Sequence, residues 1–240
     1  MAPYSRHDPL KCFTSYGEGL FWLFVLGAAA VFTAGSTPGR AYAFNAQDTP
    51  QQELSPEDAA LIYSLEGKIQ ELRNPQTNPH EGPSSMEITE AEVNTYFKHR
   101  GPEVIIDAVS DVRIFFLPGR VKGSAVANFT ELKQAQQGEE ESSFSGWLLG
   151  TMEGKRKVEY SLTLESDQGK ARVKIESVTI EGVNLPLILV DFMVNRFLEK
   201  QYGLSLDNPV PLPFQIQKVT SESGRLLLER DLAVSVPATQ

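Results

Sequence analysis

The chain of 240 residues contains one cysteine and three histidines. A single cysteine excludes a disulfide scaffold and a zinc site built from several cysteines. After the N-terminal region the histidines are His80 and His99. They are nineteen positions apart and do not form the H-E-x-x-H spacing of a helical metal site. The sequence therefore predicts no metal ligands and no cofactor.

Basic residues are also scarce, with 22 Lys+Arg against 31 Asp+Glu and a net charge of −9. A nucleic-acid partner needs a cationic surface, so none is expected. Catalytic motifs are missing too. No G-x-S-x-G elbow is present. Residues 150–155 (GTMEGK) have three residues between the glycines instead of the four of a phosphate loop, and Arg156 stands where that loop has Ser or Thr. We predict no catalytic residues and a protein that is not an enzyme.

Long apolar runs are confined to Leu20–Gly35, which follows Arg6 and Lys11. A basic start, an apolar stretch and the triplet ending at Ala43 are typical of a secretory signal peptide, here residues 1–43, cleaved after Ala43. The rival interpretation is an uncleaved anchor in the inner membrane. Sixteen helical residues span about 24 Å, less than the ~30 Å hydrocarbon core, which favours cleavage. A buried core helix is the third alternative. The signal or anchor interpretation places the rest outside the cytoplasm, in the periplasm or secreted.

Two helices are expected next. Ser55 and Pro56 are typical of a helix start, and apolar residues then recur at helical spacing to Leu72. We expect residues 44–86 to form this helix and a proline-rich linker, with 55–73 available to a protein partner. Thr89 and Glu92 form a capping box for a second helix, expected to end at Gly101-Pro102.

From residue 103 the apolar period changes from 3.6 to 2, which predicts strands joined by tight turns. The phase slips near Ser177, which indicates a β-bulge. A third helix from Leu187 to Tyr202 is apolar around much of its circumference and is expected to be buried. We predict an α+β fold: a long, strongly bent antiparallel sheet wrapped around this helix, with additional N-terminal helices. The domain would span 87–230, with a flexible tail at 231–240.

Small side chains on one predicted strand suggest a ligand site. Gly123, Ala125 and Ala127 share a face and leave space above the sheet. Either a helix docks closely on them, or a groove accepts an acyl chain. Burying fourteen carbons at ~0.8 kcal/mol each would contribute on the order of 10 kcal/mol, so no charged group is required. The expected lining, with the last two residues as lid or filler, is Ala125, Ala127, Phe129, Tyr160, Leu162, Leu164, Val190 and Val194.

A second apolar feature is the segment 144–152 (FSGWLLGTM), followed by Lys155, Arg156 and Lys157. A tryptophan beside aliphatic residues with a basic flank suits a membrane interface. Trp147, Leu148 and Arg156 would then contact the membrane surface. The alternative is an ordinary core strand or gate.

Three segments resemble a known family: residues 88–97 (ITEAEVNTYF), 178–186 (VTIEGVNLP) and the ending from Leu212 to Leu228. Together they resemble small bacterial extracytoplasmic lipid-binding-like proteins, including the mycobacterial envelope phospholipid-binding family and enterobacterial lipoproteins with a curved sheet. The resemblance covers residues 87–229. It implies a fold like half of a tubular lipid-binding module, and phospholipid binding. The chain departs from the family in lacking a lipidated cysteine and in its extra helix at 55–73.

Two functions remain after these exclusions. The first is non-enzymatic binding of a lipid or other apolar ligand in the bacterial envelope. The alternative is a structural or interaction protein of the envelope with a filled core and no ligand.

Overall fold

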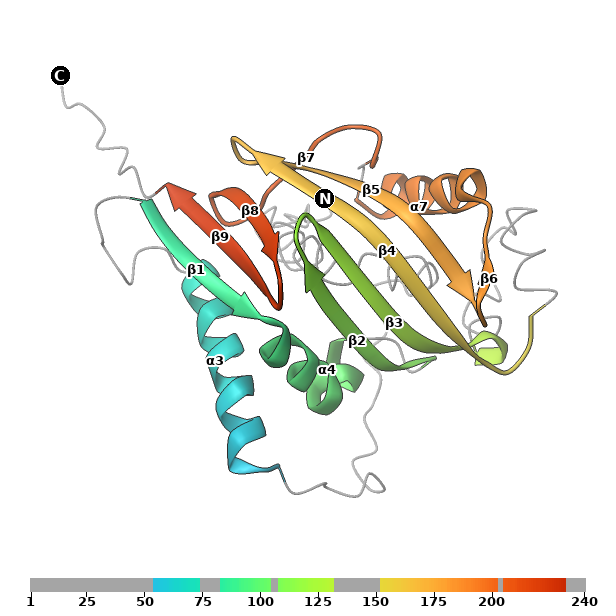
Figure 1. Cartoon of the computed structure of the whole chain (residues 1–240), viewed down its shortest axis with the longest axis horizontal. Helices are drawn as coiled ribbons and strands as arrows, with labels where there is room; N and C mark the ends of the chain where they lie inside the picture. The colour runs from blue at the N-terminus through green and yellow to red at the C-terminus, as the bar shows by residue number, and fades with distance from the viewer. Residues whose placement is uncertain (1–53, 74–82, 105–107, 132–151, 203–204, 232–240) are drawn as a thin grey trace, which may run out of the picture.

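The computed structural model describes residues 54–73, 83–104, 108–131, 152–202 and 205–231. The predicted α+β class is confirmed, with helices packed against antiparallel strands (Figure 1). In chain order the elements are α3 Pro56–Arg73, β1 Pro83–Thr89, α4 Glu90–Val104, β2 Val109–Leu117, β3 Arg120–Asn128, β4 Lys155–Asp167, β5 Lys170–Ile180, β6 Val183–Asn184, α7 Leu187–Tyr202, β7 Val210–Pro211, β8 Ile216–Glu222 and β9 Arg225–Asp231.

The strands form two sheets. The larger has the order β2-β3-β4-β5-β6, with β7 paired to β5, and the smaller has the order β1-β9-β8. The final hairpin therefore pairs with β1, which precedes the meander, and does not extend the larger sheet. Two buried or half-buried serines link the sheets. Ser221 Oγ lies 2.8 Å and 2.9 Å from the carbonyls of Leu117 and Arg120, which share its single proton, and Ser166 Oγ donates to the Val219 carbonyl.

The predicted bulge is confirmed. Ser161 pairs with Ser177, but the next residue of β4, Leu162, pairs with Ile175, so Glu176 is the extra residue. The bulge keeps Val173 and Val178 on the same face although one number is odd and the other even. On the other face, the Glu176 carboxylate accepts a hydrogen bond from Ser161 and pairs with Arg120 (3.1 Å).

The junction of β1 and α4 is set by side chains that replace missing backbone partners. Thr89 and Glu92 form the predicted capping box: the Thr89 N–H donates to Glu92 Oε2 (2.8 Å) and the Glu92 N–H to Thr89 Oγ1 (3.2 Å). Glu90 Oε2 accepts the Phe116 N–H, and Asn94 bonds both backbone groups of Ile114. These bonds cover the edge strand β2, which would otherwise be open to pairing with another chain.

Helix α3 begins as predicted, with the Asp58 N–H donating to Ser55 Oγ, and its apolar stripe is buried in the common core. The linker expected to end at residue 86 is wrong at its end, because residues 83–86 belong to β1 and Met86 pairs with Leu228. The proposed domain boundary at 86/87 therefore cuts a strand. The prolines and serines of this segment suggested a loop, but residues 83–86 form a strand because they pair with β9.

Two further expectations are corrected. Helix α4 does not stop at Gly101-Pro102 but continues to Val104, so Pro102 lies in its last turn. Helix α7 is not buried all round, since Leu187, Ile188 and Phe192 are 39%, 78% and 51% exposed. Among the described residues, no helix is both long and apolar enough to cross a membrane. The predicted signal segment, Ala43 and the tail beyond Asp231 lie outside the described residues.

Candidate functional site

The candidate site is the buried face of the larger sheet, called here the inner face. Antiparallel pairing places directly opposite residues on the same side, so the inner face can be read in cross-strand rows. It is almost wholly apolar. Two adjacent rows are Ile114, Gly123, Tyr160 and Val178, then Phe116, Val121, Leu162 and Ile175.

The space that Gly123 was expected to leave open is filled. Gly123 is directly opposite Tyr160, and a Cβ at position 123 would meet the far end of the Tyr160 ring. The ring therefore lies over the glycine, as cross-strand aromatic–glycine pairs do. The small residue makes room for a neighbour on the next strand, so the expected groove is closed at this position.

The Tyr160 hydroxyl is the polar exception on this face. Its oxygen is buried and has no hydrogen-bond partner within the part of the chain that the structure describes. Burial raises the pKa of Tyr160, so the hydroxyl remains protonated and available as a donor. A buried hydroxyl that makes no hydrogen bond costs about 1–3 kcal/mol. A polar atom from a bound molecule would remove this cost.

The structure brings the eight predicted lining residues into one core cluster, together with residues that pack around them. Ala125 is half-buried and the other seven are buried. Val190 and Val194 of α7 are each 1% exposed and contribute to the same core as the inner face. The predicted set is therefore one contiguous apolar region, in which Val190 and Val194, expected as lid or filler, are core residues.

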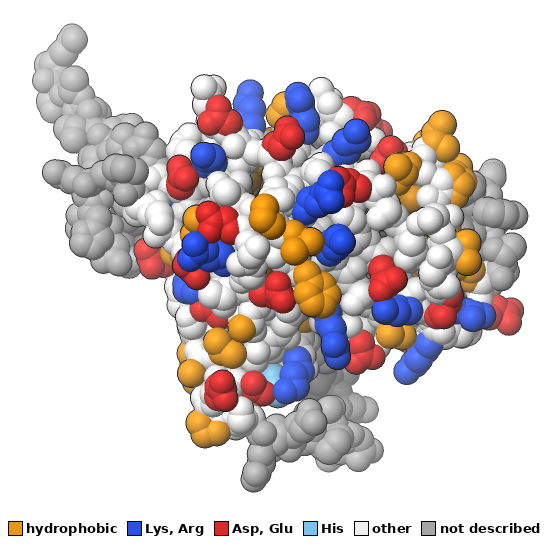
Figure 2. Space-filling model, viewed as in Figure 1, with side chains coloured by type: hydrophobic (Ala, Val, Ile, Leu, Met, Phe, Trp, Pro, Cys, Tyr) orange, Lys and Arg blue, Asp and Glu red, His pale blue; other side chains and the backbone are white. Residues whose placement is uncertain are grey.

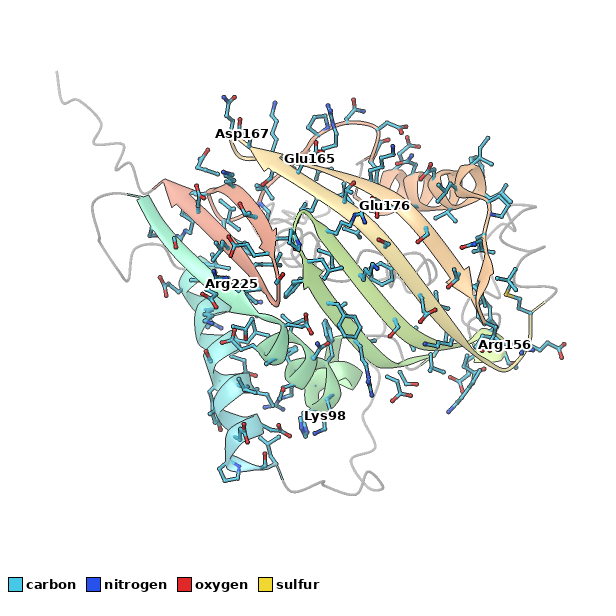
Figure 3. All side chains as sticks on the ribbon, in the orientation of Figure 1. Lys98, Arg156, Glu165, Asp167, Glu176 and Arg225 are labelled. Atoms are coloured by element: carbon cyan, nitrogen blue, oxygen red, sulfur yellow. The ribbon has the colours of Figure 1, made fainter. Side chains whose placement is uncertain are left out.

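Of the predicted membrane contacts, Trp147 and Leu148 lie outside the described residues. Arg156 is exposed at the start of β4, at the end opposite Asp167, and its Nε donates to the Glu153 carbonyl (Figure 3). The turn after β5 lies beside it, since the Glu181 N–H donates to the Lys157 carbonyl. Glu153 and Glu181 are acidic, so this end of the sheet carries both signs of charge.

The sequence reasoning missed an apolar surface on α7. Val183, Leu187, Ile188 and Phe192 are all exposed, and they are called here the α7 patch. Figure 2 shows hydrophobic side chains over α7 and β6 on the right of the view. Ile188 and Phe192 are four residues apart and share a helix face, opposite the buried Val190 and Val194. Counting the apolar residues of the helix did not reveal that one apolar face is exposed and the other is buried.

Asp191 lies on α7 one turn after Leu187 and Ile188 of the α7 patch. Partial burial and the nearby Asp207 raise the pKa of its carboxyl, while Lys174 acts in the opposite direction.

His99 on α4 contacts Asp58 on α3. Its Nε2 is 2.8 Å from Asp58 Oδ2, and Lys98 Nζ is 3.1 Å from the same oxygen. The hydrogen bonds from His99 and Lys98 hold the pKa of Asp58 below its usual value. No nucleophile or third metal-binding group accompanies them, and no cluster of three metal-binding side chains occurs in the described ranges. The arrangement joins two helices.

Comparison with known protein families, curated proteins and solved structures finds no match to this chain. The resemblance to the envelope lipid-binding-like proteins stays a prediction.

Proposed function

We propose that this chain is a non-enzymatic, extracytoplasmic protein of a bacterial envelope that binds a lipid or another apolar ligand against the inner face. The observation that carries the proposal is the buried, unpartnered Tyr160 hydroxyl on an otherwise apolar surface. Apolar pockets commonly orient a ligand with a few polar groups of this kind. An ester carbonyl or hydroxyl of the ligand would accept the Tyr160 proton.

Replacing Tyr160 with Phe tests this role. We expect the Tyr160→Phe variant to unfold at the same or a higher denaturant concentration than wild type, because it removes an unsatisfied hydroxyl and keeps the ring. We also expect it to retain less lipid. The measurement is solvent extraction of protein purified from membranes, followed by mass spectrometry.

Tyr63→Phe is the matched control, since the Tyr63 side chain is 70% exposed on α3. It should retain as much lipid as wild type. Recovery of no lipid from wild type above an unrelated secreted protein would contradict the proposal. It would favour the second candidate, an envelope scaffold with a filled core, which the position of the Tyr160 ring over Gly123 supports.

The α7 patch supports a membrane as the place where the ligand is exchanged. Exposed aliphatic and aromatic side chains on one helix face bind membranes in proportion to the apolar area they bury. We propose that this face contacts the membrane surface, together with the predicted contact Arg156.

The combined substitution Ile188→Ser and Phe192→Ser is expected to weaken association with phosphatidylcholine vesicles by at least about tenfold. Unfolding should change by no more than about 0.5 kcal/mol per site, because both side chains are more than half exposed. Vesicle flotation measures the first quantity and denaturant unfolding the second. Tyr63→Ser, on the remote helix α3, should float like wild type, and equal flotation of all three proteins would contradict the contact.

A further inference from the structure

Arg230 ends the buried face of the smaller sheet. On β9 the buried positions alternate as Leu226, Leu228 and Arg230, so the arginine occupies the last position of an otherwise apolar row. It pairs with Ser84 of β1 and Ile216 of β8. Both Arg230 and Ser84 are one residue from an end of their strands, which places the guanidinium near the rim of the sheet. Figure 1 shows α3 beside β1 and β9.

The guanidinium is almost fully enclosed, with Arg230 only 3% exposed. Its Nη1 donates to the Glu71 carbonyl over a long 3.4 Å. Its Nε and Nη2 are buried and make no hydrogen bond within the described ranges. The guanidinium carries a positive charge. A buried charge without a counter-charge is strongly unfavourable.

The two free nitrogens are informative because they lie on the same side of the planar guanidinium. Nε–H and one Nη2–H point in parallel and form the edge that grips a carboxylate or phosphate with two hydrogen bonds. The bond to Glu71 engages the other nitrogen. Contact with the last turn of α3 is favourable for a cation at a helix C-terminus. Capping α3 accounts for the hydrogen bond of Nη1. It leaves the edge formed by Nε and Nη2 without a function.

None of the acidic side chains that the structure describes bonds to this edge. Glu71 contributes its backbone carbonyl, and Glu229 is exposed on the opposite face of β9. By contrast, Arg225 at the other end of the same strand pairs with Glu87 at 3.1 Å and with Glu222 at 2.7 Å. Within the described ranges, the exposed Arg225 therefore pairs with two carboxylates and the buried Arg230 with none.

We propose that Arg230 anchors a binding site for an oxyanion, with one carboxylate or phosphate group bonded to Nε and Nη2. The site lies in the smaller sheet and does not depend on a ligand at Tyr160. A free anion and the head group of an amphiphile offer the same chemistry, and different probes separate them.

The experiment uses the full chain and three probes at constant ionic strength: inorganic phosphate, decanoate, and decanol as the uncharged control. Titration calorimetry measures binding, and thermal unfolding measures the midpoint, which a ligand specific for the folded state raises. Wild type should bind one phosphate or one decanoate, and its midpoint should rise by several degrees. Phosphate alone would identify a free anion or phosphate head group, and decanoate alone a fatty acid.

The variants are Arg230→Met, Arg230→Lys and the matched control Arg225→Gln. Arg230→Met should lose at least about tenfold in anion affinity and show no rise in midpoint, as one lost charge-assisted pair implies. Arg230→Lys keeps a cation near α3 but lacks the planar fork, so it should also lose the bidentate binding. Arg225→Gln should respond like wild type.

Two results would overturn the proposal. One is an equal rise of the midpoint in all four proteins, which is a general ion effect. The other is no binding of either anion to wild type, with Arg230→Lys as stable as wild type, which assigns the guanidinium to capping α3 alone. Arg230→Lys keeps the test valid if Arg230→Met does not fold.

Discussion

Gly123→Ala is expected to lower the free energy of unfolding by about 2–3 kcal/mol, the upper part of the range for overpacking a core. The added methyl group would lie far inside van der Waals contact with Cζ, Oη and Cε1 of Tyr160. An alanine in place of a strand glycine would otherwise be worth about 0.5–1 kcal/mol of stability. The expected sign is therefore opposite to the one that backbone propensity predicts.

The cost depends on whether the Tyr160 ring can move aside. A flexible surface side chain would yield cheaply, but Tyr160 is only 8% exposed and has just two side-chain torsions. Its neighbours across the strands, Gly123 and Val178, are also buried. Any swing of the ring must therefore displace packed atoms, which interiors at close-packed density resist.

Denaturant unfolding of four proteins isolates this contact: wild type, Gly123→Ala, Tyr160→Ala and the double variant. We expect the double variant to be no less stable than Tyr160→Ala, because the methyl group then has room. The coupling energy should be about 2 kcal/mol or more. Gly67→Ala is the control, for which the free energy of unfolding should change in the opposite direction. Nothing lies within 4 Å of its added methyl group in the middle of α3, so it should gain about 1 kcal/mol. Additive losses at 123 and 160 would contradict the packing argument.

The segment 88–97 shows how much of the fold could be predicted from the sequence. The capping box at Thr89 and Glu92 is local, so spacing alone identified it. The buried positions Val93, Tyr96 and Phe97 followed from helical periodicity. The tasks of Glu90 and Asn94 could not be predicted, because both bond to backbone groups of β2 that lie twenty or more residues further along the chain.

The candidate site was predicted less well, for a related reason. Alternation identified the residues of the inner face, but their distance from one another across the sheet depends on register. Register decides that Gly123 faces Tyr160 and so decides that the space is occupied. Arg230 could not be found at all, since an alternating strand gives no signal that its last inward residue is a charged one, or that its Nε and Nη2 lack partners among the described residues.

The second large effect is expected at Glu92, which joins α3 to α4. Its carboxylate is 4% exposed and receives hydrogen bonds from Lys68, Ser64 and both donors of Thr89. Glu92→Ala should lower the free energy of unfolding by about 3 kcal/mol, as removal of one partner of a buried ion pair does. Glu92→Gln preserves the capping box and should cost about 1.5 kcal/mol, the lower limit for bonds to a charged group.

The same carboxylate should make the fold sensitive to acid. Burial alone would raise the pKa of Glu92, but the bonds from Lys68, Ser64 and Thr89 outweigh it and hold the pKa below the ordinary 4.5. The folded state thus binds the proton less readily than the unfolded state. Stability from this group is fully present above pH 4.5 and is lost as the pH falls through the folded-state pKa.

The free energy of unfolding of wild type should therefore exceed that of Glu92→Gln at neutral pH but not in acid, because the glutamine cannot titrate. Urea unfolding at about pH 7 and about pH 3 measures the difference at each pH. Glu165→Gln on β4 is the control. Its exposed side chain should give the same small difference at both pH values. A difference between wild type and Glu92→Gln that stays constant between the two pH values would show that the hydrogen bonds, and not the charge, hold α3 to α4.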